Sequence, residues 1–158
     1  MTSAPTPDPD RPDRPRPDGR PDPGQHGADP GGADAETTFA AFRRAQVLLA
    51  QRRPLDAVQA LLPVLATQPD SASVHLLAGR AFLDSAQLRR AEAAFIRVLE
   101  IDPADHYARF ALGKALQRQG RFTESLAQLR MASAMDPRPE YQDAIGEVSA
   151  RIAFGDQD

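Results

Sequence analysis

Three prolines set a period for most of this chain: Pro69, Pro103 and Pro137 each lie 34 residues apart. The segment from Ala72 to Asp105, which contains the second of these prolines, has small and aromatic side chains at positions suited to two packed helices. These positions are His75, Ala78, Gly79, Phe82, Ala91 and Phe95. A period of about 20–50 residues predicts a stack of similar units, so we expect a repeat array instead of one globular core.

The segments on both sides follow the same order when they are aligned on the prolines. The unit that contains Pro137 has Leu112, Gly113, Leu116, Ser125 and Leu129 at the matching positions. The unit that contains Pro69 has Ala45, Leu48, Ala57 and Leu61 there. This first unit departs from the pattern at Arg44, which takes the place of Ala78. The middle unit therefore defines the pattern, and the first unit matches mainly in its second half.

This order of residues resembles the tetratricopeptide repeat (TPR), a unit of ~34 residues that folds as two antiparallel helices. The resemblance implies an all-α fold, a right-handed α-solenoid of three helix-turn-helix units at 38–71, 72–105 and 106–139. The repeat domain would span 36–153, with a tail at 154–158. The chain also looks like small actinobacterial TPR proteins, because its eighteen arginines and one lysine are the usage expected of a GC-rich coding sequence.

Local signals predict where the first two helices begin. Thr37 or Thr38 can cap the first helix, and Pro54 suits the first position of the second helix. Pro63 falls inside that second helix and removes a backbone N–H, so we expect a kink near Leu62. This kink is either a tolerated distortion of a terminal unit or a functional hinge.

Other residues have a predicted structural role in the later units. Gly79 lacks a Cβ, which lets the two helices of its unit approach closely. Asp105 can cap the first helix of the third unit, and Gly120 suits the turn that follows that helix. Ser125 takes the place of a small core residue.

One more amphipathic segment follows Pro139. Its apolar residues at helical spacing are Tyr141, Ala144, Ile145, Val148 and Ile152. No second helix follows before Gly155. A solenoid exposes an apolar face at each open end, and a helix with a polar outer side can cover that face. We therefore expect residues 140–153 to form a capping helix.

The N-terminal segment has a different composition. The first 35 residues hold nine prolines, seven aspartates and four arginines, without a run of apolar side chains. Such a segment cannot bury enough apolar surface to offset the entropy of the chain. We expect residues 1–35 to form a disordered Pro/Asp/Arg-rich arm, locally extended as polyproline II, that acts as a tether.

Charge and composition exclude several classes of function. Residues 36–158 hold fifteen acidic and fifteen basic side chains, so the repeat domain lacks the basic field that nucleic-acid binding needs. The absence of cysteine excludes disulfides, thiolate-bound iron–sulfur clusters and cysteine nucleophiles. We see no signal peptide and no run of 18 apolar residues, and therefore expect a cytoplasmic protein without membrane contact.

Candidate catalytic and metal-binding residues are few. His26, His75 and His106 have no ligand partner three or four residues away, and His75 takes a position where TPR units often place a large aromatic side chain. Ser125 has no nearby histidine that could act as a base. We therefore expect no enzyme activity, no cofactor and no metal site.

Repeat geometry predicts which surface binds a partner. The first helices of stacked units line a concave face, and such faces bind extended or helical peptides. In TPR proteins the groove-lining residues recur at fixed positions of these helices. Carried over by the resemblance, they are Phe39, Phe42, Gln46 and Leu49, then Ser73, Leu76, Arg80, Leu83 and Asp84, then Tyr107, Phe110, Lys114, Gln117 and Arg118.

This groove set mixes apolar side chains with the cations Arg80, Lys114 and Arg118. We predict that it binds a protein or peptide that has apolar anchors and one or two acidic groups. The alternative for the aromatic residues is packing inside the fold, and the alternative for the arginines is simple solvation.

One TPR class holds the C-terminal carboxylate of Hsp70 or Hsp90 with a clamp of lysine, asparagine and arginine side chains. The positions that match this clamp are Phe42, Gln46, Leu77, Tyr107 and Ala111. None of these residues can form it, so the clamp is absent.

The resulting expectation is a non-enzymatic protein–protein interaction module, an adaptor or scaffold with a peptide groove. Three alternatives stay open: self-association into a homo-oligomer, a regulatory subunit of an enzyme, and a chaperone similar to the small TPR chaperones of type III secretion.

Overall fold

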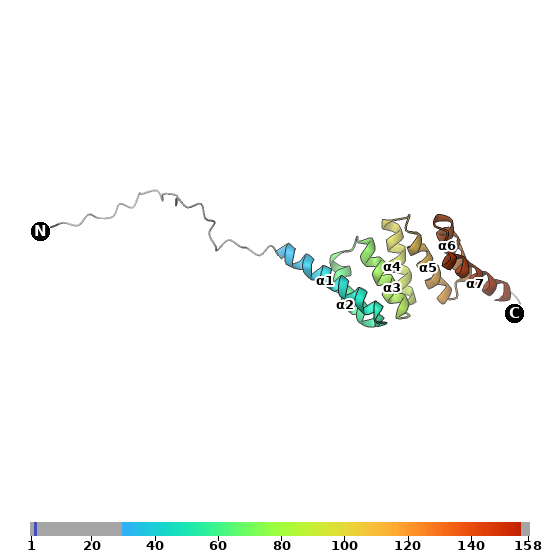
Figure 1. Cartoon of the computed structure of the whole chain (residues 1–158), viewed down its shortest axis with the longest axis horizontal. Coiled ribbons are helices and arrows are strands. Elements are labelled where there is room, and N and C mark those ends of the chain that lie inside the picture. Colours follow the sequence, from blue (N-terminus) through green and yellow to red (C-terminus); the bar gives the residue numbers. More distant parts are fainter. Residues whose placement is uncertain (1, 3–29, 156–158) are drawn as a thin grey trace.

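The structure, a computed structural model, describes residue 2 and residues 30–155, so most of the predicted arm lies outside the described residues. Within the described part all regular structure is helical, in seven α-helices (Figure 1). They are α1 (Pro30–Ala50), α2 (Pro54–Thr67), α3 (Ala72–Asp84), α4 (Leu88–Ile101), α5 (His106–Arg118), α6 (Phe122–Met135) and α7 (Pro139–Gly155). The all-α prediction is confirmed.

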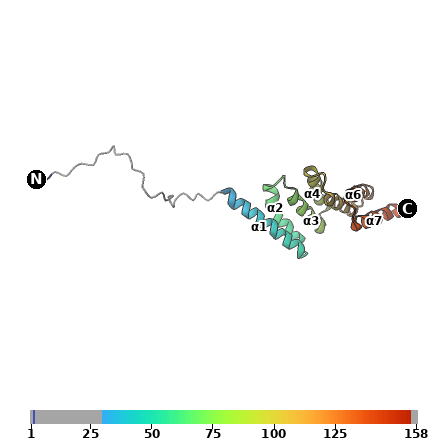
Figure 2. The same ribbon diagram turned by 45° about the horizontal axis from the view of Figure 1, so that its top comes forward.

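The helices form a stack with α1 at one end and α7 at the other (Figures 1 and 2). Each helix packs on the next one in sequence, and α1 also contacts α3, α3 contacts α5, and α5 contacts α7. The first helices of successive units therefore lie side by side. We call the surface that α1, α3, α5 and α7 form the A-helix face.

The 34-residue period reappears in the bounds of the helices. The helices α2, α4 and α6 are each 14 residues long and begin at Pro54, Leu88 and Phe122. The turn between the two helices of each unit repeats as well, because Arg52, Ala86 and Gly120 have positive φ angles of 59°, 60° and 75°. The turn predicted at Gly120 is thus confirmed.

In the second and third units, close packing of the two helices depends on one glycine of the first helix. A Cβ on Gly79 would lie 2.5 Å from a ring carbon of Phe95, and a Cβ on Gly113 would lie 2.8 Å from the side chain of Leu129. The fully buried Ser125 donates a hydrogen bond from Oγ to the carbonyl oxygen of Gly113, at 2.7 Å. The predicted close approach at Gly79 and the core position of Ser125 are confirmed.

Side chains cap the first helices of the second and third units, and the cap predicted at Asp105 is confirmed. The side chain of Asp105 accepts a hydrogen bond from the backbone N–H of Ala108 at 2.8 Å. Ser71 accepts one from the N–H of Val74 at 3.4 Å. These acceptors satisfy N–H groups that have no partner within the first turn of a helix.

The start of the first helix was predicted wrongly. Helix α1 begins at Pro30 and not at Thr37 or Thr38, so residues 30–35, assigned to the disordered arm, are helical. The reason is local. Proline loops precede the other first helices, at Pro69 and Pro103, whereas no proline interrupts the chain between Pro30 and Pro54.

The apolar stripe of α2 continues past Pro63. Val64 is buried, whereas Leu62 is 39% exposed, and the helix continues through Pro63 to Thr67. The hydroxyl of Thr67 donates to the carbonyl oxygens of Pro63 and Val64, both at 3.2 Å. The residues 34 and 68 positions after Val64 are Val98 and Ala132, both buried, so the period itself indicates this register. The kink near Leu62 stays a prediction.

Helix α7 extends slightly beyond the predicted range of 140–153. It buries Tyr141, Ala144 and Val148, and Ile145 and Ile152 pack partly on the same core as Leu129 of α6. The amide of Gln142 donates to Ser133 Oγ at 2.6 Å. Gly146 is exposed, and no atom of the described residues lies near the position of an added Cβ, in contrast to Phe95 at Gly79. The capping role of α7 stays a prediction.

Candidate functional site

The A-helix face presents most of the predicted groove residues, in different states of exposure. Phe39 and Tyr107 are 66% and 37% exposed, and Arg80 and Arg118 are exposed as well. Phe42, Leu76 and Leu83 are half-buried and pack on the core. Leu49 is an exception, because it is a core residue with only 8% exposure and contributes little surface.

The N-terminal half of this face contains a cavity of about 350 Å³ between α1, α2 and α3. Its lining is mainly apolar: Ala35, Thr38, Phe39, Phe42, Val64, Gln68, Ser73 and Val74. Among the predicted residues, Phe39 and Phe42 provide the aromatic wall. Sequence reasoning missed the contributions of Val64 and Gln68, which come from the second helix of the unit and from the residue after it.

Arg80 lies on α3 two turns after Ser73. It forms no hydrogen bond or ion pair with any residue between 30 and 155. Seven residues of α-helix correspond to about 10 Å, so an exposed cation lies near an apolar cavity on the same face. The equivalent residue of α1 is Gln46, which accepts a hydrogen bond from Arg43 at 3.1 Å.

The C-terminal half of the face is different, because α7 engages the predicted groove residues of α5. Lys114 Nζ lies 3.5 Å from Glu147 Oε2, and Gln117 donates to the same oxygen at 3.3 Å. The hydrogen bond from Gln117 and the charge of Lys114 hold the pKa of Glu147 below its ordinary value. The cation of Lys114 is therefore already paired within the protein.

The aromatic residues of α5 also contact α7. The rings of Phe110 and Tyr141 are stacked, with centroids 4.5 Å apart, and Tyr107 is tilted against Phe110 at 6.3 Å. Because of this stacking, packing inside the fold describes Phe110 better than it describes Phe39, which is 66% exposed.

Arg118, which is also on α5, donates to the carbonyl oxygen of Leu83 on α3 at 2.5 Å.

A histidine links α5 to α7 beside these rings. His106 Nδ1 lies 2.9 Å from the hydroxyl of Tyr141, and His106 Nε2 lies 3.2 Å from Asp136 Oδ2. A neutral imidazole can accept from the phenol through Nδ1 and donate to the carboxylate through Nε2. Burial raises the pKa of Tyr141. This arrangement joins α5 to α7 and to the residue after α6.

The described part of the chain contains neither a cluster of metal ligands nor a membrane-spanning helix. No group of three or more histidine, cysteine or acidic residues in the described part of the chain could hold a metal ion. None of the helices α1 to α7 is long and apolar enough to cross a membrane.

Comparison with known families and structures identifies the fold. Two family models, both described as tetratricopeptide repeat, match residues 42–85 and 82–148. A search of curated proteins finds no significant match. Many solved structures are similar.

Three of these similar structures illustrate the range. The Arabidopsis OM64 TPR domain is 18% identical, with a TM-score of 0.69, and the match covers 73% of this chain and 96% of that one. The second TPR domain of human RPAP3, in complex with an HSP70 peptide, is 13% identical at a TM-score of 0.68, with coverage of 73% and 98%. MamA is 17% identical at a TM-score of 0.70, with coverage of 78% and 72%. At these identities the likeness shows the fold alone.

Proposed function

Because the chain belongs to the tetratricopeptide repeat family, a family of protein–protein interaction modules, we propose that it is a non-enzymatic adaptor that binds a partner peptide on its A-helix face. We place the protein in the cytoplasm as part of this proposal. The site is the N-terminal half of the face, with Phe39, Phe42, Leu76 and Arg80 as the contact residues.

One observation carries the proposal: an open apolar cavity lies next to a cation that has no partner among the described residues. Phe39 is 66% exposed at this cavity, and a large exposed aromatic side chain is typical of binding surfaces. Arg80 can pair with a carboxylate of the ligand without first breaking an internal ion pair. The equivalent cation of α5, Lys114, lacks this advantage because it is paired with Glu147.

The distance between the two features defines the ligand. An apolar anchor at Ser73 and an acidic group at Arg80 would lie about 10 Å apart along the helix. This span corresponds to about three residues of an extended peptide, or about seven residues of a helical one. We therefore propose a ligand with one apolar anchor and one acidic residue at either of these spacings.

The peptides of the HSP70 and HSP90 complexes are not included in this proposal, although TPR neighbours are bound to them. Two positions that match the carboxylate clamp, Leu77 and Ala111, are only 5% and 3% exposed. Buried apolar side chains supply no donor to a terminal carboxylate.

Binding of a peptide library tests the proposal. Fluorescence polarisation would compare fluorescein-labelled peptides that vary in the spacing between a leucine and a glutamate. We expect Phe39→Ala and Arg80→Gln each to weaken binding of the best peptide by about five- to tenfold, which corresponds to about 1 kcal/mol or slightly more. Both side chains are exposed, so thermal stability should be unchanged.

Lys114→Gln is the matched control, because Lys114 follows Arg80 by 34 residues on the next first helix. It should leave peptide affinity unchanged. Equal effects of Arg80→Gln and Lys114→Gln, or binding that does not need the glutamate, would refute the assignment of Arg80. Light scattering after size exclusion distinguishes a peptide-binding monomer from a self-associating array.

A further inference from the structure

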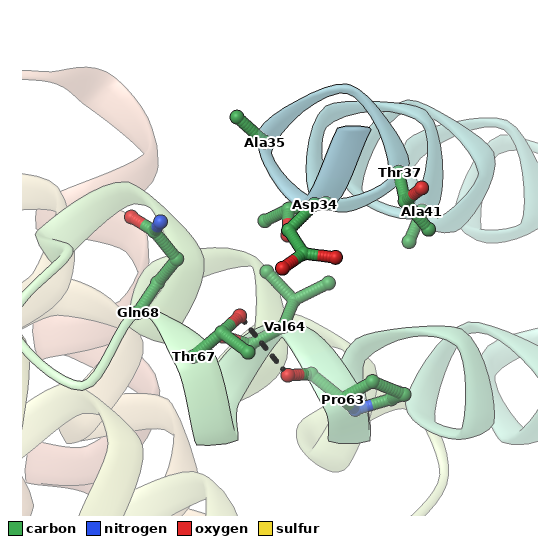
Figure 3. Close-up of a pocket in the computed structure, with 9 residues that line it drawn as sticks. Asp34, Ala35, Thr37, Ala41, Pro63, Val64, Thr67 and Gln68 are labelled. Atoms are coloured by element: carbon green, nitrogen blue, oxygen red, sulfur yellow. Dashed lines mark hydrogen bonds between the residues drawn. The ribbon is translucent and has the colours of Figure 1, made fainter. Parts of the chain in front are cut away.

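A second cavity, of about 590 Å³, lies between α1 and α2 beside the N-terminal half of α1 (Figure 3). Its lining residues are Asp34, Ala35, Thr37, Thr38, Ala41, Pro63, Val64, Thr67 and Gln68. Val64 and Pro63 form an apolar floor on α2, and the carboxylate of Asp34 points from α1 toward that floor (Figure 3). The cavity therefore combines apolar surface with one acidic group.

Comparison with the second unit shows which side chain takes the place of Pro63 there. The residue 34 positions after Pro63 is Arg97, whose guanidinium donates to Asp70 Oδ1 at 2.5 Å and to Glu100 Oε2 at 2.9 Å. Asp70 precedes α3, so Arg97 joins the second helix of this unit to the start of the first. An arginine paired with an acid therefore bridges the two helices in this part of the second unit.

The third unit supplies an arginine from the opposite helix. The residue 68 positions after Ala41 is Arg109, whose guanidinium donates to the carbonyl oxygen of Pro103 at 3.1 Å and lies 4.0 Å from Met131 Sδ. Met131 takes the position of Pro63 and Arg97. In the second and third units, therefore, a guanidinium group links the residues before the first helix to the second helix.

The first unit lacks this group because both positions are short, at Ala41 and Pro63. The direction of α1 also contributes to the cavity between α1 and α2. The second and third units reach their first helix through a loop after Pro69 or Pro103, whereas α1 continues straight as helix from Pro30. The residues before Thr38 therefore continue along the helix axis instead of turning across the end of α2.

From this comparison we propose that the α1–α2 cavity is a receptor site for an arginine side chain of a partner protein. The methylene groups of the arginine would contact Ala41, Pro63 and Val64, and its guanidinium would pair with Asp34. Asp34 forms no hydrogen bond or ion pair with another described residue, so its carboxylate is available. Arginine suits such a site because its stem is apolar and its planar head pairs with a carboxylate.

The chain's own N-terminal segment also contains arginines, and its charge argues against it as the ligand. Residues 1–29 hold six acidic side chains and four basic ones, and Arg11 and Arg14 each follow an aspartate directly. Such a segment carries a net negative charge, which is unfavourable beside Asp34. A basic segment of another protein lacks this penalty.

An NMR titration of the full chain tests the site. The probe is Nα-acetyl-arginine amide, and Nα-acetyl-norleucine amide serves as the uncharged control with a similar stem. We expect the arginine probe to shift the backbone amide signals of Thr38, Thr67 and Gln68, and to bind about fivefold more tightly than the norleucine probe, as for one exposed charge pair. Equal affinity of the two probes would overturn the proposal.

Two variants test the cavity and the carboxylate separately. Ala41→Arg places the arginine of the third unit in the equivalent position and should abolish the shifts by filling the cavity. Asp34→Asn should lower the affinity for the arginine probe to that of norleucine. Unchanged binding in either variant would overturn the site, and Asp34→Asn alone decides if Ala41→Arg does not fold. Deletion of residues 1–29 should leave the affinity unchanged, whereas a severalfold gain would show that the chain's own arm occupies the cavity and would refute the partner assignment.

Discussion

At Gly79 the second helix of the unit leaves no space for a methyl group. A Cβ there would lie 2.5 Å from the ring of Phe95, which is fully buried and cannot move aside. We expect Gly79→Ala to lower the free energy of unfolding by about 1–3 kcal/mol in urea titrations, despite the higher helix propensity of alanine.

Gly146 is the matched control, because it also lies inside a first helix but has open space around it. Gly146→Ala should raise the free energy of unfolding by about 0.5–1 kcal/mol, since only helix propensity changes. Loss of stability in both variants would show that a further contact, absent from the described residues, covers α7.

The turn positions allow a second prediction at the scale of single residues. Ala86 has a φ angle of 60°, and the equivalent residue of the third unit is Gly120, with a φ of 75°. A non-glycine residue in this region costs about 1–2 kcal/mol, although glycine loses more backbone entropy on folding. We expect Ala86→Gly to raise the melting temperature by a few degrees and Gly120→Ala to lower it. The opposite signs in calorimetry would contradict the assigned turn.

At the scale of helices, one carboxylate joins two units. Arg121 Nη1 donates to Glu92 Oε1 and Oε2 of α4 at 2.7 and 2.8 Å, and Gln119 donates to Glu92 Oε2 at 3.0 Å. Burial raises the pKa of Glu92, but these hydrogen bonds and the charge of Arg121 outweigh burial and hold the pKa below its ordinary value of 4.5. The carboxylate form therefore stabilises the fold.

The pH dependence follows from the sign of this shift. Because the folded-state pKa is lowered, the stabilisation is complete above the unfolded value near 4.5 and is lost as the pH falls below it. We expect Glu92→Gln to lower the free energy of unfolding by about 1–2 kcal/mol at pH 7, and by clearly less at pH 3.5, in urea titrations. Glu124→Gln is the control, because Glu124 also pairs with Arg121 but is 59% exposed, and it should have a small effect.

At the scale of the whole molecule, stability should vary along the array. Each unit contacts only its neighbours, so the terminal units are stabilised from one side. The first unit also borders cavities of about 590 and 350 Å³ and contains Pro63, which lacks a backbone donor. We expect the amides of α1 and α2 to have protection free energies at least about 1 kcal/mol below those of α4 and α5 in hydrogen exchange. Equal protection would show that the first unit is not the weakest.

The sequence predicted much of the fold because its signals are local or periodic. Pro54, Asp105 and Gly120 act within one or two turns, and Gly79 follows from the repeat. The predicted start of α1 was wrong because a residue with a capping preference, such as Thr37, can also lie inside a helix when no proline forces a loop before it. A capping preference alone therefore does not locate the first residue of a helix.

The candidate site was less predictable than the fold. The residues of the A-helix face were listed from their positions, but whether Lys114 is free depends on Glu147, 33 residues later. Whether Phe110 is an anchor depends in the same way on its stacking with Tyr141. The roles of these residues in binding stay proposals.

The 34-residue period, the helical class, the glycines of the second and third units and the cap of the third unit could all be predicted from the sequence, because they follow from residue spacing and from backbone chemistry. The folded structure was needed to show which cations are paired, which aromatic rings are covered, and that a cavity lies beside Ala41 and Pro63. Pairing and burial depend on distances between side chains of different helices, and residue spacing along the sequence does not contain these distances.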